Sequence, residues 1–352
     1  MGKQIGFSEI EYGLKRKKTR REIFLEKMER IVPIELFCDC IRPHYYVKGN
    51  GRQPIELGVM VKMYLISHWY NLSDEGTEDL IYENQAVRKY VGIDLSVENA
   101  PDRTTLCKFR HLLEREKLNG KIFEELTKAF ERNRLIFKEG AIVDATIIEA
   151  PESRKNKERK RDEEMSVTRK NSRYYFGFKA NTAVDEGTGI VKKVVVTTAS
   201  VADIEAVSTV LSGDEKRVGG DAGYIGIEHR SDICEKYQDK ENPGTETYYN
   251  HKKGKLTLHR KRADIEFVIA RKRAGIRKLS EKEQEIIKEE ERAKSKTRAK
   301  VEHPYRIVKQ VFGFRKTRYR GLSKNENKMY MLFALANLYL AVQKNKILTI
   351  TR

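Results

Sequence analysis

The apolar pattern of the chain changes at Gly140, and this change limits the folds that are open to it. Before Gly140, apolar side chains recur at helical spacing, whereas after it they form short runs rich in β-branched residues. The clearest run is Ala141–Ile148 (AIVDATII), which predicts a buried strand. Phe176–Asp185 and Ile190–Ala199 predict two more strands, and the EGTG between them indicates a hairpin. We therefore expect a helical first half and a mixed α/β second half.

The rest of the second half alternates helices with strands. Its predicted elements are a helix over 203–212, a strand over 217–221, a helix over 227–237, a strand over 265–270, one long helix over 280–312 and a closing helix over 325–343. This order is typical of an α/β domain with a mixed sheet, which we place at residues 136–345. Within it, residues 152–173 include nine Lys/Arg and five Asp/Glu, and they predict a mobile charged loop that is solvated or touches DNA.

The first half divides into two expected parts. Residues 1–50 form an arm, with the basic run KRKKTRR at Lys15–Arg21 and then a helix over 22–37. Residues 51–135 form a helical domain, in which Ser73–Glu78 is expected to be a turn with an N-cap. Its later helices are expected over 80–90, 104–116 and 119–133. Short helices with basic outer faces suit docking on DNA, and a plain helical packing domain fits the pattern equally well.

The charge balance points to a polyanionic partner. The chain has 71 Lys+Arg and 52 Asp+Glu, a formal net charge of +19. Such a surplus favours nucleic acid before a membrane surface, with a merely soluble basic protein as the alternative. The longest apolar-rich run, Met329–Val342, is shorter than the roughly 20 residues that a membrane span needs, and no signal peptide is expected. The four cysteines lack zinc-ligand spacing and are expected to be reduced, as in a cytosolic protein: Cys38, Cys40, Cys107 and Cys234.

Three acidic residues stand where a carboxylate needs a cation. Asp144 lies in the middle of an apolar strand, and Asp221 lies at the end of another. Glu302 is the only acid among nine Lys/Arg between Arg298 and Lys324. A buried carboxylate is costly without a partner, so each would meet either an Arg or Lys, or a metal ion. Carboxylates suit Mg²⁺, and paired Mg²⁺ ions that share acidic ligands catalyse phosphoryl transfer.

The segment Arg298–Leu322 resembles the C-terminal signature of DDE-class insertion-sequence transposases, specifically the IS-five group. Arg298, Glu302 and Lys309 match the Arg-x3-Glu-x6-Lys part of that signature, and Ser295 stands where the signature has tyrosine. On a regular helix Lys309 lies about two turns after Glu302 and shares its face, which suits a lysine that holds DNA. Arg298 shares that face too, and it either pairs with Glu302 or contacts DNA.

Other segments resemble the same family in the same order. IVDATIIEAP at 142–151 resembles the first aspartate motif, and GGDAGY at 219–224 resembles the second, which gives Asp144 and Asp221. The helical stretch Arg52–Leu113 resembles the family's N-terminal domain. The resemblance therefore extends over most of the chain.

The resemblance implies an α/β fold: a ribonuclease H-like mixed-sheet catalytic core with an all-helical N-terminal domain. Asp144 on the first strand, Asp221 on the fourth and Glu302 on a closing helix would be the catalytic residues. They would also bind two Mg²⁺ ions, for which Mn²⁺ would substitute. The implied DNA-binding residues are Arg298, Lys309, Arg306, Arg315, Lys316, Arg318 and Arg320.

The implied function is DNA transposition, with metal-dependent cleavage at the transposon ends and strand transfer into target DNA by 3′-hydroxyl attack. The expected partners are double-stranded DNA, as terminal inverted repeats and as target, and a second copy of the chain in a synaptic homodimer. No membrane partner and no nucleotide cofactor are expected, and the expected location is the cytoplasm of a bacterium or archaeon, at the nucleoid. Two alternatives stay open: a ribonuclease H-like nuclease without strand transfer, and a catalytically silent DNA-binding repressor.

Overall fold

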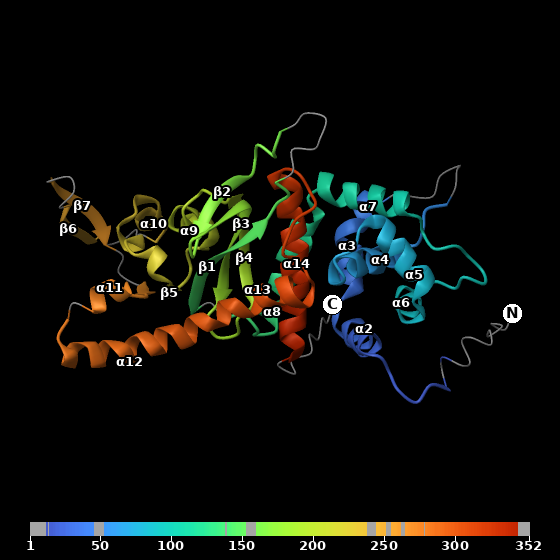
Figure 1. The fold of residues 1–352 in the computed structure, drawn as a ribbon, viewed down its shortest axis with the longest axis horizontal. Helices are drawn as coiled ribbons and strands as arrows, with labels where there is room; N and C mark the ends of the chain where they lie inside the picture. Colours follow the sequence, from blue (N-terminus) through green and yellow to red (C-terminus); the bar gives the residue numbers. More distant parts are fainter. Residues whose placement is uncertain are drawn as a thin grey trace. The chain divides into compact units, whose positions relative to one another are not determined.

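The computed structural model divides the chain into two compact units, Met1–Leu112 and Leu113–Arg352 (Figure 1). It describes residues 12, 14–45, 53–137, 139–152, 160–237, 244–250, 255–261, 265–277 and 279–343. Parts of the expected N-terminal arm and of the expected charged loop lie outside these described residues. Within the described ranges, no helix has the length and hydropathy that crossing a bilayer requires.

The first unit is built from helices, as the sequence predicts. They are α2 (Arg20–Ile31), α3 (Ile34–Ile41), η1 (Arg42–His44), α4 (Leu57–Trp69), α5 (Asp74–Glu83), α6 (Gln85–Val91) and the larger part of α7 (Arg103–Arg115). Helix α4 is buried over most of its length, because its apolar residues lie on all sides. The Trp69 ring meets Phe24 and Tyr90 edge-on, with each pair of ring centroids 5.5 Å apart. Trp69 therefore belongs to the core of this unit.

Two helices expected to be continuous are each broken into two. Pro33 separates α2 from α3, because proline holds the preceding Val32 in an extended conformation. Asn84 ends α5 and begins α6, where its Oδ1 accepts a hydrogen bond from the Val87 N–H at 3.1 Å. The N-cap expected within Ser73–Glu78 is Ser73, whose hydroxyl accepts a hydrogen bond from the Gly76 N–H at 3.0 Å. The turn expected over these residues is wrong, because α5 already begins at Asp74.

The second unit contains a mixed six-stranded sheet. Its strands are β1 (Gly140–Glu149), β2 (Ser166–Lys170), β3 (Arg173–Asp185), β4 (Val191–Thr198), β5 (Arg217–Gly220) and β8 (Glu266–Ile269). Strands β1, β3 and β4 pair antiparallel, whereas β1, β5 and β8 run parallel. The predicted hairpin is the β3–β4 pair. This arrangement confirms the expected ribonuclease H-like mixed sheet, which follows a helical N-terminal region in the sequence.

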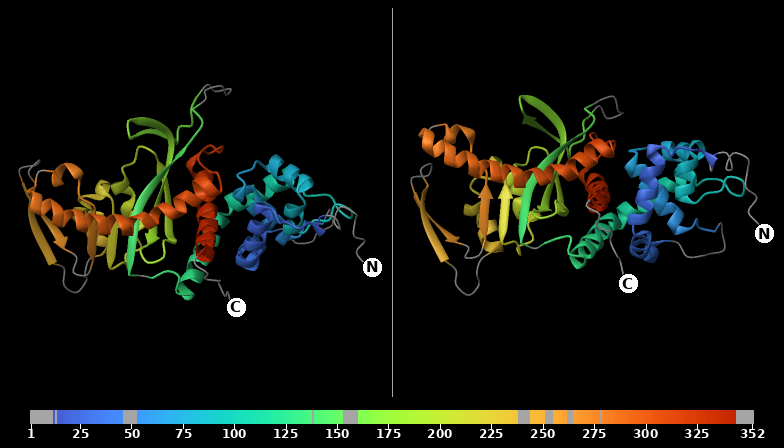
Figure 2. Two further views of the ribbon diagram at one scale, coloured as in Figure 1. Left: turned by 60° about the horizontal axis from the view of Figure 1, so that its bottom comes forward. Right: turned by 90° about the horizontal axis from the view of Figure 1, so that it is seen from below.

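Helices cover both faces of this sheet (Figure 2). The helices of the second unit are α8 (Leu118–Arg132), α9 (Asp203–Val210), η2 (Ala222–Tyr224), η3 (Ile227–His229), α10 (Ser231–Lys236), α11 (Arg273–Ile276), α12 (Glu281–Arg298), η4 (Ala299–Val301), α13 (Glu302–Arg306), η5 (Ile307–Val311) and α14 (Leu322–Gln343). On one face, Val143 and Ala183 pack in a cluster with Val207 of α9 and Ile233 of α10. On the other, the Asn337 side chain of α14 exchanges two 2.8 Å hydrogen bonds with the Val191 backbone.

Three elements of the second unit differ from the prediction. Residues 152–173 were expected to be a loop, but Ser166–Lys170 forms β2, which pairs antiparallel with Arg173–Gly177 of β3. A second hairpin, β6 (Gly244–Asn250) with β7 (Lys255–Lys261), was not predicted. Helix α8, which the sequence groups with the N-terminal helices, packs on α14, and the Asn119 amide donates to the Asn327 carbonyl at 3.1 Å.

Candidate active site

Asp144 lies on β1, and Asp221 directly follows β5, the parallel strand beside it. The register of β1 and β5 places Ile142 beside Gly219. Asp144 and Asp221 each follow two residues later, and adjacent strands lie about 4.8 Å apart. On its other side Asp144 is opposite Thr182 of β3. Both aspartates are half-buried, and they occupy the edge of the sheet at which parallel strands end and at which α/β proteins form their sites.

The glycines of the GGDAGY segment make room for the groups around Asp221. Asp221 begins η2, and its Oδ1 accepts a hydrogen bond from the Gly223 N–H at 2.8 Å. A Cβ on residue 223 would lie 2.9 Å from that oxygen. A Cβ on Gly220 would lie 3.0 Å from the ring of Tyr224, which is buried beneath the loop. The close approaches at Gly220 and Gly223 therefore explain why this motif places glycine on both sides of the aspartate.

Replacing Gly220 with alanine is expected to destabilise the second unit by about 1–3 kcal/mol, because the added methyl group overpacks the site against Tyr224. Chemical denaturation measures the effect. Gly275 in α11 is the matched control, since a Cβ there meets nothing within 4 Å. Gly275→Ala should leave the free energy of unfolding unchanged or slightly raised. Equal stability of the two variants would mean that the loop moves to accept the methyl group.

Glu302 follows an interruption in the long C-terminal helix. The chain leaves α12 at Arg298, tightens into a 3₁₀ turn over Ala299–Val301, and continues through α13 into the wider π-helical turn Ile307–Val311. Pro304 contributes to this change, because it has no N–H to donate within the helix. The sequence predicted one helix over 280–312, and the structure confirms a helical path whose type changes around Glu302. Glu302 itself is exposed.

Three side chains tie this helical path to the sheet. Lys300 Nζ donates to the Glu186 carbonyl at 2.6 Å, the Tyr305 and Thr182 hydroxyls lie 2.6 Å apart, and Lys309 Nζ donates to the Ile147 carbonyl at 2.7 Å. Thr182 is the register partner of Asp144, and Ile147 is on the same strand as Asp144. Glu302 stands between the first two anchors in the sequence. The fold therefore fixes the backbone of Glu302 relative to the strand that bears Asp144.

Electrostatic effects link the three acids. Burial raises the pKa of Asp144 to about 6, and the hydrogen bond from the Ala145 N–H, at 2.8 Å, opposes this rise. The negative charges of Asp221 and Glu302 raise the same pKa further, and the positive charge of Lys170 lowers it. Each of the two other predicted acids thus lies near enough to Asp144 to act on its ionisation.

The chemistry of these donors fits a divalent metal ion. Among the described residues, no three acidic, histidine or cysteine side chains lie close enough together to form a ready-made metal cage. The three acids nevertheless offer only oxygen ligands, as Mg²⁺ prefers. A cation between them would also relieve the repulsion that raises the pKa of Asp144. Asp144, Asp221 and Glu302 are therefore the residues that would hold such an ion.

The predicted DNA contacts fall into two groups. Arg306, Arg315, Lys316, Arg318 and Arg320 are exposed. In the second group, Arg298 lines a cavity of about 210 Å³ beside β5 and α12, and the described residues show no ion pair between it and Glu302. Burial lowers the pKa of Lys309, and the negative charge of Glu302 opposes part of this lowering. The Lys309 ammonium is bound to the Ile147 carbonyl of β1.

Buried rings anchor the segment that bears the exposed cations. Phe312 and Phe314 are almost fully buried, and Arg315 and Lys316 point outward after them. The backbone of this segment lies beside the end of β1, where the Thr317 N–H donates to the Glu149 carbonyl at 2.8 Å. The rings thus hold the segment, and the cations are displayed at the end of the strand that contains Asp144.

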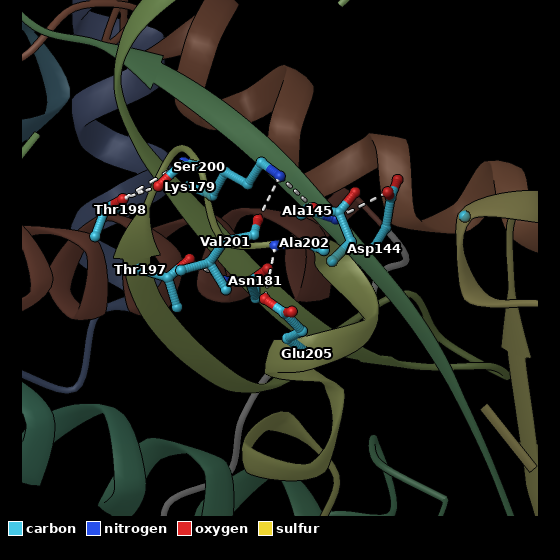
Figure 3. A network of polar contacts seen from close by, with 12 residues as sticks. Asp144, Ala145, Lys179, Asn181, Thr197, Thr198, Ser200, Val201, Ala202 and Glu205 are labelled. Carbon is cyan, nitrogen blue, oxygen red and sulfur yellow. Dashed lines mark hydrogen bonds and ion pairs between the residues drawn. The ribbon is translucent and has the colours of Figure 1, made fainter. Parts of the chain in front are cut away.

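Two residues near the acids escaped the sequence analysis. Tyr305 and Tyr224 are buried, and burial raises the pKa of each well above its usual value; the charge of Asp144 adds to the rise in both. Beside Asp144 a polar network also joins β3 to the end of β4 and to the segment that leads into α9 (Figure 3). In it Lys179 donates to the Val201 carbonyl and to Asp203, both at 2.8 Å. Tyr224 lies in GGDAGY and Tyr305 lies between Glu302 and Lys309 of the C-terminal signature, so both stand inside motifs that could have pointed to them.

Two family models match this chain. Residues 136–338 match the model described as a transposase DDE domain, which covers the sheet and all three acids. Residues 13–112 match the model described as a transposase domain (DUF772). The two matches fall on the two compact units, and the first covers more than half of the chain. No solved structure matches the chain.

Proposed function

The chain belongs to the DDE transposase family, and on that premise we propose that it cuts the ends of its own mobile element and joins them to target DNA. The observation that carries this proposal is the position of Asp144 on β1 and of Asp221 at the end of the adjacent parallel strand β5, with Glu302 on the helical path that Tyr305 joins to β3. The match of Arg298, Glu302 and Lys309 to the Arg-x3-Glu-x6-Lys signature supports assignment to the IS-five group.

The side chains of the site would hold and orient the reacting groups. Two Mg²⁺ ions bound by Asp144, Asp221 and Glu302, or Mn²⁺ in their place, would activate the attacking water or 3′-hydroxyl and stabilise the leaving oxygen. The Gly223 N–H orients Asp221, and the Ala145 N–H orients Asp144. These local hydrogen bonds fix both carboxylates before DNA arrives.

The basic segment that follows η5 would bind the DNA backbone. Its cations are Arg315, Lys316, Arg318 and Arg320, and all four are exposed. Arginine and lysine on phosphates position DNA without distinguishing bases, so they would hold the scissile strand near β1. Arg298, Arg306 and Lys309 complete the proposed contact set, although Lys309 would have to leave the Ile147 carbonyl to reach DNA. Sequence recognition of terminal inverted repeats would then fall to the N-terminal helices, in a synaptic homodimer at the nucleoid.

A strand-transfer assay tests the proposed function. Labelled duplexes with the ends of the element that encodes this chain are incubated with the protein, a target plasmid and Mg²⁺ or Mn²⁺. Joined products are expected. Cleavage without joining would favour the ribonuclease H-like nuclease, and DNA binding without cleavage in either metal would favour the silent repressor.

Replacing Tyr305 with phenylalanine is expected to loosen Glu302 relative to Asp144. The variant keeps the buried ring and removes the hydroxyl that meets Thr182 at 2.6 Å. We expect a loss of about 1 kcal/mol of stability and about tenfold weaker Mn²⁺ binding, as for other groups that position metal ligands. Titration of Mn²⁺ by electron paramagnetic resonance measures the second effect. Tyr339→Phe is the control, because it also removes one tyrosine hydroxyl and its ring packs on Phe312 instead of contacting Thr182. Unchanged Mn²⁺ affinity in Tyr305→Phe would assign Tyr305 to packing alone.

A further inference from the structure

The tip of the β2–β3 hairpin is basic and sharply turned. Lys170 and Arg173 face each other across the turn Asn171–Ser172, where both residues have positive φ, 49° and 64°. Such a two-residue turn keeps the two strands closely paired to their ends. Between Ser166 and Gly177 the hairpin contains three cations and no acid. It therefore presents a uniformly positive projection.

The hairpin also exposes an aromatic ring. Tyr174 is 71% exposed, which is unusual for so large a ring. It is the cross-strand partner of Arg169, whose guanidinium carbon lies 5.7 Å from the ring centroid. The ring is thus supported from one side by a cation. A supported, exposed ring among cations is the arrangement on which unpaired nucleobases stack.

The base of the hairpin is fastened to the sheet. Ser166 Oγ lies 2.6 Å from Thr198 Oγ1 and accepts a hydrogen bond from the Ser200 N–H at 2.7 Å. Thr198 and Ser200 belong to the polar network beside Asp144 (Figure 3). The tip therefore projects from a fixed base instead of from a free loop.

The hairpin lies on the side of the candidate active site. Tyr174 and Thr182 are an even number of residues apart on β3, so they share a face of the strand, and Thr182 is opposite Asp144. The ring of Tyr174 is therefore presented on the face of the sheet that carries Asp144.

We propose that the β2–β3 hairpin is a DNA-binding arm, in which Arg169, Lys170 and Arg173 bind phosphates of the strand that enters the active site and Tyr174 stacks on an unpaired base beside the cut. The identity of the polymer rests on the proposed function. The hairpin is a DNA-binding surface outside the C-terminal signature Arg298–Leu322. The ligand proposed for the exposed Tyr174 ring is an unpaired nucleobase.

DNA binding in the presence of EDTA tests the arm without requiring catalysis. The probes are two fluorescent duplexes of the same sequence, one fully paired and one with a 2-aminopurine left unpaired. Removing all three cations (R169A, K170A, R173A) should weaken binding to both probes and reduce the salt slope by about 2–3. Removing three exposed cations from the acidic helix α12 (K282A, K288A, R292A) should change both much less.

The tyrosine is tested on the unpaired probe. Tyr174→Ala should weaken binding to it about tenfold and abolish quenching of 2-aminopurine, whereas Tyr174→Phe should retain both. Affinity of Tyr174→Ala for the fully paired probe should stay unchanged. Equal affinities and salt slopes for the hairpin and α12 variants would overturn the arm, and equal quenching by Tyr174→Ala would overturn the stacking.

The two proposals fail separately. Normal cutting and joining by the hairpin variants, with unchanged DNA affinity, would reject the arm and leave the proposed function standing. Loss of DNA affinity in the hairpin variants of a protein that never cuts DNA would reject the proposed function and leave the arm.

Discussion

Asp144→Asn is expected to lose cleavage and joining together, by roughly 10³-fold or more, the scale of losing a group that acts on the transition state. The amide keeps the shape of the side chain and removes its charge. Asp144 lies on β1 between β3 and β5, where its neighbours are Thr182 and Asp221, and Asp221 already has its own role in the proposed site. Asp221→Asn should have the same effect. The measurement is the rate of product formation on labelled transposon-end DNA in Mg²⁺ and in Mn²⁺.

Glu266→Gln is the matched control for this experiment. Glu266 begins β8, at the opposite edge of the same sheet, where it pairs with Arg217 at 2.8 Å. It is exposed, and its loss should change the rate less than twofold, since surface ion pairs contribute little. Retention of wild-type rates by Asp144→Asn would remove Asp144 from the chemistry and, with it, the proposed site.

The same substitution is expected to stabilise the metal-free protein above pH 6. Asp144 has a pKa of about 6 in the folded protein against an ordinary value of 3.8, so the folded state binds the proton more tightly than the unfolded state. The contribution of this carboxyl group to the free energy of unfolding therefore falls as the pH rises from about 4 to about 6, and it stays at the lower value above pH 6. Asparagine does not ionise, so it avoids this loss, which amounts to at most about 3 kcal/mol.

Denaturation in urea at several pH values, with EDTA present, measures this gain. Asp144→Asn should exceed the wild type in stability at pH 8 and match it near pH 4. Mg²⁺ should raise the stability of the wild type at pH 8 and leave that of Asp144→Asn nearly unchanged, because a ligand stabilises only the state that binds it. A variant that is less stable than the wild type at pH 8 would show that the ionised carboxylate is already well paired in the fold.

The strands nearest the site could be predicted from the sequence, because their apolar runs are short, rich in β-branched residues and bounded by turns. The register of β1 with β5 then follows from a parallel pairing, and it brings two aspartates from distant motifs to adjacent positions. Strand β2 was missed because its cations resemble a solvated loop. Its pairing with β3 decides its structure, as is common for strands whose propensity depends on their neighbours. This extra strand is also why Asp221 follows β5 and not a fourth strand.

The supports of Glu302 could not be predicted. Lys309 was expected to reach DNA from a regular helix, but the π-helical turn and the contact with Ile147 place its ammonium on β1. The Tyr305–Thr182 hydrogen bond joins residues far apart in the sequence. Such a contact depends on the packing of α13 against β3, which no local pattern contains.

The most direct test of the central claim is Mn²⁺ binding by wild type, Asp144→Asn, Asp221→Asn and Glu302→Gln, measured by electron paramagnetic resonance without DNA. If the three acids hold the ions together, each substitution should weaken binding by about tenfold or more, and Glu266→Gln should not. Wild-type Mn²⁺ affinity in any one of the three variants would contradict a site shared by all three carboxylates.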